Sequence, residues 1–277
     1  MVTADVAELN LGTSCPADLP PNHIHLPSWV SLDEAAVIPF ISQIFLTDST
    51  HGDLPARLKA TVDTVRRAFP NCRHTLFNDE ALRSFIAEHY ENDVVETYEA
   101  LRPYAYKADL GRYCILNVTG GWYFDVAVTV QTGIAVTEGV EFLAFRDIQR
   151  NSATSWACAT SVLYSRPGNP VLRTAIDHIV RNRKENYYGV TPLCPTGPSL
   201  LGEALALHRG NARHLFGDFL VLTPAHPVRN HAFVLSDGTI LAWGKRAAGG
   251  DLTPFGVSGG NNYNDLWKAR QIYRTQP

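Results

Sequence analysis

The segment from residue 107 to residue 128 carries side chains that can bind and polarise a charged ligand. It reads KADLGRYCILNVTGGWYFDVAV. Asp109 and Arg112 are three residues apart, and residues with this spacing share one face of a helix. Taken alone, such a pair is most simply an intrahelical ion pair worth roughly 0.2–0.5 kcal/mol. The residues that follow the pair therefore decide whether it has a functional role.

A third charged side chain follows the pair at the end of an expected strand. Two glycines, Gly120 and Gly121, end the helix that carries Asp109 and Arg112, and an aromatic run over residues 122–124 then indicates a buried strand. Asp125 stands at the carboxyl end of that strand. Ligands of α/β folds bind beyond the carboxyl ends of the strands. We therefore expect the two aspartates and the arginine to form one ligand-binding site.

The elements around this segment alternate between strand and helix. An apolar run over residues 38–46 predicts a buried strand, and a helix follows with Pro55 in its first turn. Residues 73–77 alternate like a second strand, and Asn78 is suited to cap the next helix. Further elements are expected as strands at 141–145 and 160–164, a helix after the turn at 167–170, and a hairpin from residue 231. This order predicts an α/β domain with a mainly parallel sheet.

Length and composition are those of an ordinary globular domain. The 277 residues are 45% hydrophobic and 18% charged. We expect a polar, proline-rich lead-in over residues 1–35 and a single domain over residues 36–277. The net charge of −3 gives no electrostatic support for binding nucleic acid. Neither a signal peptide nor an apolar stretch of about 18 residues is visible, so we expect no transmembrane segment and a cytoplasmic location.

The central segment resembles a known family. The run ADLGRYCILNVTGGWYFD, residues 108–125, is similar to the core of the DXD-motif glycosyltransferases of family 32, relatives of the clostridial glucosylating toxins. The strand IPFISQIFL at residues 38–46 and the tripeptide Thr196-Gly197-Pro198 fall in the family's order. The stretch GNNYNDLW at residues 260–267 resembles the family's closing stretch less specifically. The resemblance covers about residues 37–200 and, more weakly, the C-terminal part.

The resemblance implies a fold and a reaction. The fold is GT-A-type, a Rossmann-like domain for nucleotide-sugar binding with a mixed, mainly parallel sheet. The implied reaction moves a hexose from a UDP- or GDP-sugar to a hydroxyl of a glycan or lipid-linked oligosaccharide, with retention of anomeric configuration. The implied cofactor is Mn²⁺ or Mg²⁺. Family habit also implies a role in surface polysaccharide synthesis.

Site residues are implied by the same resemblance. Asp109 holds sugar hydroxyls, Arg112 contacts the sugar or the diphosphate, and Asp125 is the first Asp of the DXD motif. These three residues form the implied catalytic group. Phe45 takes the place of the family's usual tryptophan near the base. The implied donor-binding residues are Gln43, Ile44, Phe45, Asp109, Arg112, Gly121, Asp125 and Lys245.

The sequence departs from the family at the second acid of the motif. The triplet reads Asp125-Val126-Ala127. In an extended chain, residues i and i+2 face the same side, so two acids there can share one hard cation. The methyl group of Ala127 ligates nothing. Three interpretations are open: Asp125 works with other oxygen ligands, the enzyme uses little metal, or the chain binds nucleotide sugars without transferring them.

Replacements for the missing acid are available in the C-terminal third. The proposed metal ligands are Asp125, His231 and Asn262, with Asn261 as a further oxygen ligand. Lys245 or Arg246 offers another solution, because a cationic side chain can neutralise phosphate charge directly.

A serine hydrolase is the weakest alternative. Residues 256–260 read GVSGG and match the GxSxG pattern around a nucleophilic serine, here Ser258. That motif requires a preceding strand and a later histidine. Residues 253–255, Thr-Pro-Phe, make a poor strand, and the last histidine of the chain is His231. A glycine-rich loop that closes over a donor is the better interpretation.

Overall fold

A computed structural model describes most of the chain after residue 39. The described residues are 40–48, 54–136, 139–148, 154–208, 210, 213–222, 231–245, 250–258 and 261–274. The expected lead-in at residues 1–35 and the candidate Arg246 lie outside them. No helix in these ranges is long and apolar enough to cross a membrane.

A mixed sheet forms the centre of the described chain. Its nine strands run in the order β2-β1-β3-β6-β5-β7-β8-β9-β4. Their bounds are β1 Ile41–Ile44, β2 His74–Phe77, β3 Gly121–Phe124, β4 Thr129–Val130, β5 Phe142–Arg146, β6 Cys158–Ser165, β7 His214–Val221, β8 His231–Val234 and β9 Ile240–Trp243. Within the described ranges, pairing is parallel in β2-β1-β3 and between β5 and β7, and the other five ladders are antiparallel. The predicted α/β class with a mixed sheet is confirmed. Among the first three strands, β1 pairs in parallel with both β2 and β3.

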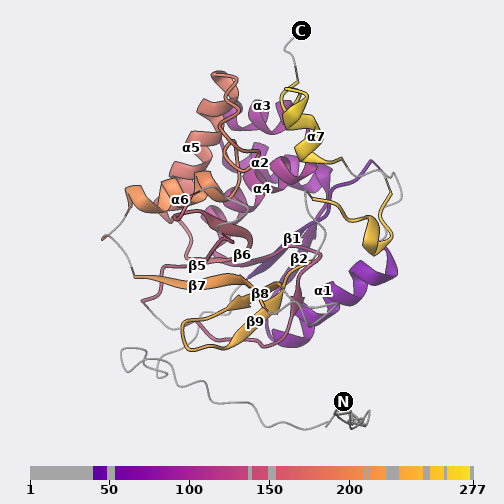
Figure 1. Cartoon of the computed structure of the whole chain (residues 1–277), viewed down its shortest axis with the longest axis vertical. Coiled ribbons are helices and arrows are strands. Elements are labelled where there is room, and N and C mark those ends of the chain that lie inside the picture. The colour runs from indigo at the N-terminus through magenta and orange to yellow at the C-terminus, as the bar shows by residue number, and fades with distance from the viewer. Residues whose placement is uncertain are drawn as a thin grey trace, which may run out of the picture. The chain divides into compact units, whose positions relative to one another are not determined.

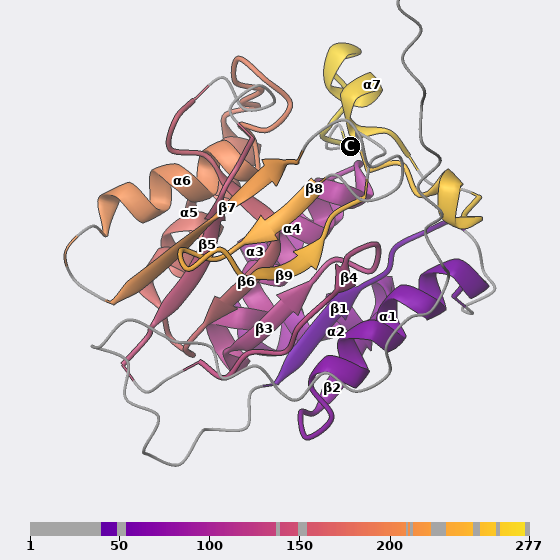
Figure 2. The ribbon, with the colours of Figure 1, turned by 60° about the horizontal axis from the view of Figure 1, so that its bottom comes forward.

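Helices cover both faces of this sheet unequally. Their bounds are α1 Ala56–Ala68, α2 Asp79–His89, α3 Asn92–Ala100, α4 Tyr104–Thr119, α5 Pro170–Lys184, α6 Pro198–Leu207 and α7 Tyr263–Lys268, with a 3₁₀ helix η1 at Thr253–Phe255. Figures 1 and 2 show α2 to α6 gathered on one face and α1 on the other. The predicted cap is confirmed, because the Asn78 side chain accepts a hydrogen bond from the backbone N–H of Ala81 at 2.8 Å.

The strand that leads to Asp125 alternates between the two faces, as a pleated strand must. On one face, Trp122 and Phe124 of β3 pack against Phe69, with ring centroids 5.9 and 5.7 Å apart. Tyr123, between them, belongs instead to the large apolar cluster under the helices. All three β3 aromatic side chains are fully buried. The strand is therefore fixed from both sides, which holds the residue after it in place.

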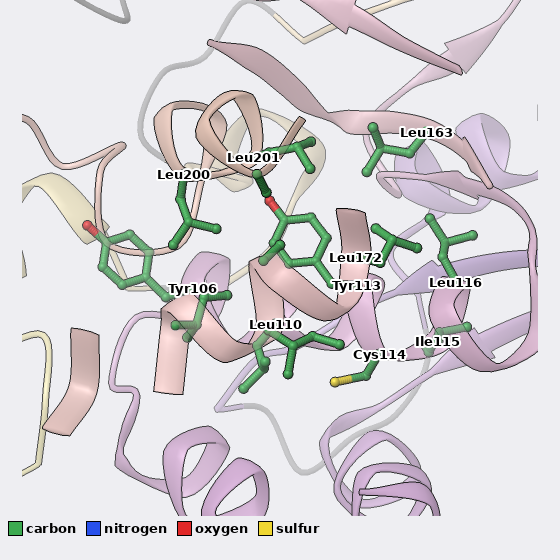
Figure 3. Packing of buried hydrophobic residues seen from close by; sticks show 14 of the residues in the cluster. Tyr106, Leu110, Tyr113, Cys114, Ile115, Leu116, Leu163, Leu172, Leu200 and Leu201 are labelled. Atoms are coloured by element: carbon green, nitrogen blue, oxygen red, sulfur yellow. The ribbon is translucent and has the colours of Figure 1, made fainter. Parts of the chain in front are cut away.

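Helix α4 lies in the middle of the helical layer. Its buried residues surround the axis, as expected of a helix covered on several sides. Figure 3 shows Leu110 and Tyr113 of α4 packing towards Leu172 of α5 and Leu200 and Leu201 of α6. Such enclosure fixes the direction in which the polar residues of the helix point.

The turn from α4 into β3 depends on its glycines. Gly120 caps the helix with φ +63°, and Gly121 follows with φ +89°. A Cβ on Gly121 would lie 2.0 Å from the carbonyl oxygen of Phe40. Gly121 is therefore needed for the close approach of β3 to the chain before β1.

Candidate active site

The segment after β3 is a turn rather than a continued strand. The Asp125 backbone N–H donates to the Ser161 carbonyl at 2.8 Å, and the Val128 N–H returns to the Asp125 carbonyl at 3.0 Å. The expectation that residues 125 and 127 lie in extended chain is therefore wrong, because the hydrogen bond between Val128 and Asp125 closes a turn over residues 125–128. The side chain of Ala127 is 5% exposed and packs in an apolar cluster with Phe45.

Arg112 connects the two aspartates. Its Nη1 lies 3.2 Å from Asp125 Oδ1, and its Nη2 lies 3.3 Å from Asp109 Oδ1. Nη1 also donates to the Thr160 carbonyl at 2.6 Å, and the guanidinium lies over the Tyr123 ring, 4.5 Å from its centroid. The Arg112 side chain is only 4% exposed. The structure thus brings together the three residues named from the sequence, at the end of β3.

Asp109 lies behind Arg112 and is enclosed by hydroxyl groups. Thr160 Oγ1 donates to its Oδ1 at 3.1 Å, and Thr196 Oγ1 donates to its Oδ2 at 2.8 Å. Burial raises the pKa of Asp109, and the Arg112 cation opposes that shift. Because both carboxylate oxygens already contact protein groups, the structure places Asp109 as a support for Arg112. Its predicted contact with sugar hydroxyls stays a prediction.

Asp125 is the open member of the three. Its side chain is 34% exposed, against 9% for Asp109. The buried Tyr123 hydroxyl donates to Asp125 Oδ1 at 2.8 Å, and burial raises the Tyr123 pKa well above its usual range, so this hydroxyl stays a donor. Tyr123 and Arg112 both contact Oδ1, and no protein donor in the described chain contacts Oδ2. Asp125 can therefore accept hydrogen bonds from a ligand.

Asp125 and Arg112 face an open pocket. The space within it is about 670 Å³, a figure that includes open solvent at the mouth. Its wall is formed by Ile44, Phe45, Leu46, Tyr104, Ala105, Ala108, Arg112, Asp125, Val126, Ala127, Lys245, Gly250, Leu252, Val257 and Asn261. Most of this wall is apolar, and its charged side chains are Arg112, Lys245 and Asp125.

Five of the eight predicted donor-binding residues line this pocket: Ile44, Phe45, Arg112, Asp125 and Lys245. Gln43 is buried behind the wall, where its Nε2 lies 3.5 Å from the Asp125 carbonyl oxygen and its Oε1 lies 2.7 Å from His74 Nε2. Gly121 stands at the opposite end of β3 from Asp125. There it allows β3 to approach the Phe40 carbonyl more closely than a side chain would permit. Asp109 supports Arg112 from behind.

Lys245 is the second cation of the pocket wall. It follows β9 by two residues, and its Nζ donates to the Asp251 carbonyl at 2.8 Å. Burial lowers the pKa of Lys245, and the carboxylates of Asp125 and Asp251 oppose that shift. The cation therefore lies within the electric field of Asp125.

The predicted metal ligands do not meet in the pocket. Neither His231 nor Asn262 lines it. His231 Nδ1 lies 3.0 Å from the Lys245 carbonyl oxygen, and the Asn262 side chain caps α7 by accepting from the Asn264 N–H at 2.9 Å. Asn261 does line the pocket, but its Oδ1 accepts from the Tyr104 N–H at 2.8 Å.

The donor set in the described residues does not fit a chelated divalent cation. No group of three or more His, Cys, Asp or Glu side chains in these ranges is arranged to hold a metal ion. The pocket offers one carboxylate, Asp125, with Arg112 paired to it and Lys245 in the same wall. Hard cations bind several oxygen ligands and are repelled by neighbouring cations.

The sequence interpretation missed several parts of this site. Ala108 and Ala105 line the pocket one turn and two turns before Arg112, so helical spacing alone could have found them. Thr160 and Tyr123 act through contacts that only the folded chain reveals. Thr196, noted in the sequence only as part of a tripeptide, donates its hydroxyl to Asp109.

The segment before Ser258 does not have the geometry of a nucleophile elbow. Residues 253–255 form η1, a 3₁₀ helix, where that motif requires a strand. The Ser258 carbonyl accepts a hydrogen bond from Thr47 Oγ1 at 3.0 Å, which ties this segment to the chain after β1.

Comparison with known proteins identifies the region that builds this site. Residues 55–142 match the family model described as "Glycosyltransferase sugar-binding region containing DXD motif". The chain is therefore similar to DXD-motif glycosyltransferases over this region. The match includes α4, β3 and the turn that begins at Asp125. The resemblance to DXD-motif glycosyltransferases is therefore confirmed.

Two curated relatives are named as glycosyltransferases. The chain is 25% identical over 161 residues to the uncharacterized glycosyltransferase L373 of Acanthamoeba polyphaga mimivirus, which covers 57% of this chain and 61% of that protein. It is 29% identical over 127 residues to the putative glycosyltransferase HOC1 of Saccharomyces cerevisiae, which covers 40% of this chain and 32% of that protein. The chain thus spans less than two thirds of the length of either relative. A solved structure described as PaToxG glycosyltransferase aligns with a TM-score of 0.47 and 17% identity, over 63% of this chain and 70% of that one.

Proposed function

We propose that the protein transfers a hexose from a UDP- or GDP-sugar to a hydroxyl group of a glycan or lipid-linked oligosaccharide. The observation that carries this proposal is the Arg112 guanidinium, held between Asp109 and Asp125 at the wall of an open pocket. This arrangement lies within the region that matches the sugar-binding family. A GT-A-type donor site is the interpretation that unites these two findings.

The pocket has separate surfaces for the parts of a nucleotide sugar. Ile44, Phe45 and Leu46 offer an apolar wall on which a base can pack. Arg112 and Lys245 offer positive charge to the diphosphate, whose negative charge grows as it leaves. The partly exposed Asp125 carboxylate offers an acceptor for hexose hydroxyls. Catalysis would then come from positioning and from charge stabilisation of the leaving group.

The proposed transfer retains anomeric configuration. The acceptor oxygen bonds to the anomeric carbon on the face from which the nucleoside diphosphate departs. The bond from that carbon to the phosphate oxygen breaks, and the acceptor proton moves to the departing phosphate. Retention, a role in surface polysaccharide synthesis and a cytoplasmic location are parts of this proposal that rest on the family resemblance.

A second candidate is a nucleotide-sugar-binding protein without transfer activity. The observation in its favour is Ala127, which stands where the motif has its second acid and is buried among apolar side chains. The two candidates share the pocket and differ only in turnover.

A panel of UDP- and GDP-hexoses separates them. Binding is measured by calorimetry, and release of the nucleoside diphosphate by a coupled assay. The transferase proposal predicts that at least one sugar is both bound and cleaved. Binding without cleavage, with glycan acceptors present, would favour the second candidate. If no sugar binds more tightly than about 1 mM, a free energy of roughly −4 kcal/mol, both fail.

A further inference from the structure

We propose that Lys245 replaces the divalent cation of the DXD motif and neutralises the donor diphosphate directly. This inference rests on the proposed function, because it assigns the charge chemistry of the same pocket. It follows from the place of Lys245 and Ala127 in the wall of one pocket and from the contacts already made by Arg112 and Asp125.

The sheet brings Lys245 and the position of the missing acid to the wall of one pocket. Strand β4 follows the turn that contains Ala127, and it pairs with β9 in antiparallel register, Thr129 with Trp243 and Val130 with Ala242. Ala127 lies two residues before Thr129, and Lys245 lies two residues after Trp243. Both residues line the pocket. The position where the family carries a metal-binding acid therefore lies in the same pocket wall as a cation.

Asp125 alone is poorly suited to hold a metal ion. Its Oδ1 already receives the Tyr123 hydroxyl at 2.8 Å and faces Arg112 Nη1 at 3.2 Å. Within the described chain, Oδ2 is the Asp125 oxygen that contacts no protein donor, so it is the one left for a ligand. A hard cation at this oxygen would be repelled by two positively charged side chains of the same pocket wall, Arg112 and Lys245.

The charge of Lys245 is available to a ligand, whereas that of Arg112 is shared. Arg112 forms ion pairs with both Asp109 and Asp125. Lys245 forms no ion pair with any described residue, and its Nζ donates to a backbone carbonyl, that of Asp251. An ammonium group has three donor hydrogens, so donors remain for phosphate oxygens.

Lys245 is also held in position before any ligand binds. Its Nζ bonds to the Asp251 carbonyl on the segment that leads into η1. Its own carbonyl lies 3.0 Å from His231 Nδ1 on β8. A cation fixed in this way loses little freedom when an anion binds, which favours a charge-stabilising role.

The test measures UDP and GDP binding by calorimetry with the full chain, in excess EDTA and in Mn²⁺. We expect the dissociation constant of the bound nucleotide to change less than about threefold between the two conditions. Lys245→Met should weaken binding roughly 10- to 100-fold in EDTA, the range for a lost charged hydrogen bond. Lys245→Arg should recover most of the loss. Lys59→Met, at an exposed position on α1, is the matched control and should bind like the natural chain.

Three results would overturn the inference. Binding that requires Mn²⁺ and is unchanged in Lys245→Met would restore the metal and leave the proposed function standing. Equal binding by Lys245→Met and Lys59→Met in EDTA would remove Lys245 from the site. Absence of UDP and GDP binding in both conditions would overturn the proposed function together with this inference. Circular dichroism of each variant distinguishes a lost contact from a lost fold.

Discussion

Arg112 Nη1 and Asp125 Oδ1 lie 3.2 Å apart, and this contact joins the centre of α4 to the turn after β3. The same guanidinium reaches Asp109, so one side chain fixes two carboxylates of different exposure. A planar guanidinium can donate in several fixed directions, whereas an ammonium group is a single compact charge. The geometry of the site therefore depends on arginine specifically.

Arg112→Lys should lower kcat/KM for the nucleotide sugar by about 100-fold or more, the range seen when one charge-stabilising donor is lost. The reason is that lysine keeps the charge but cannot reach both carboxylates and the Thr160 carbonyl together. Steady-state kinetics measures the effect. Arg173→Lys is the control, because Arg173 is 43% exposed and pairs with Glu91 and Asp177 on the surface. Activity of Arg112→Lys within threefold of the control would show that the bridge is dispensable.

Thr196→Val should destabilise the fold by about 1–3 kcal/mol, because it leaves a buried carboxylate oxygen without its hydroxyl donor. Thr196 Oγ1 donates to Asp109 Oδ2 at 2.8 Å, and both side chains are buried. Urea denaturation measures the change in the free energy of unfolding. Thr196→Ser, which keeps the hydroxyl, should recover most of the loss. Equal stability of the valine and serine variants would mean that the hydroxyl contributes nothing to holding Asp109.

His74 should make stability fall on acidification. Burial, followed by the nearby Arg66 cation, lowers its pKa from 6.5 to about 4, while Asp63 opposes the shift. Between these two pH values the unfolded chain binds more protons than the folded one, so the free energy of unfolding decreases as pH falls from 6.5 to about 4. Above 6.5 this contribution is complete.

The measurement is urea denaturation of the natural chain and of His74→Gln between neutral pH and pH about 5, within the window that the shifted pKa defines. The glutamine variant should show a smaller loss of stability over this range, because it has no proton to bind. His89→Gln, at an exposed position on α2, should behave like the natural chain. Parallel pH profiles for all three proteins would contradict the role given to His74.

Gly121→Ala should destabilise the fold more than Gly168→Ala. Both glycines have positive φ, +89° and +71°, so alanine is strained at either position by about 1–3 kcal/mol. Only at Gly121 would the new Cβ also meet backbone, the Phe40 carbonyl oxygen at 2.0 Å. Thermal denaturation of the two variants measures the difference. If Gly121→Ala folds as stably as Gly168→Ala but loses donor affinity, the sequence-based assignment of Gly121 to the donor site is right and its structural role is minor.

The residues around Asp125 show what the sequence alone could predict. Asp109 and Arg112 have helical spacing, and a strand pattern leads to Asp125. Because α/β folds bind ligands beyond the carboxyl ends of their strands, the sequence predicted that these three side chains lie close together. Local patterns also predicted the helix cap at Asn78. Such features depend on neighbours a few residues apart.

Other parts of the site depend on contacts between distant segments. Asp125, at the start of the turn over residues 125–128, is held by a backbone hydrogen bond to Ser161 on β6. Lys245 and Ala127 come to one pocket wall through the pairing of β4 with β9, strands more than a hundred residues apart in the chain. Thr160 reaches Asp109 from β6, and Thr196 reaches it from the loop just before α6. No local pattern marks these partners.

The most direct test of the account is the rate of nucleoside diphosphate release from the preferred nucleotide sugar by the natural chain and by Asp125→Asn. Asparagine keeps the size of the side chain but loses its charge, and at this 34% exposed position it should leave the fold intact. Asp177→Asn, on the exposed face of α5, is the control. We predict release by the natural chain and the control, and a loss of about 100-fold or more in Asp125→Asn. Release at the same rate by all three proteins would contradict the claim that the carboxylate after β3 anchors the donor.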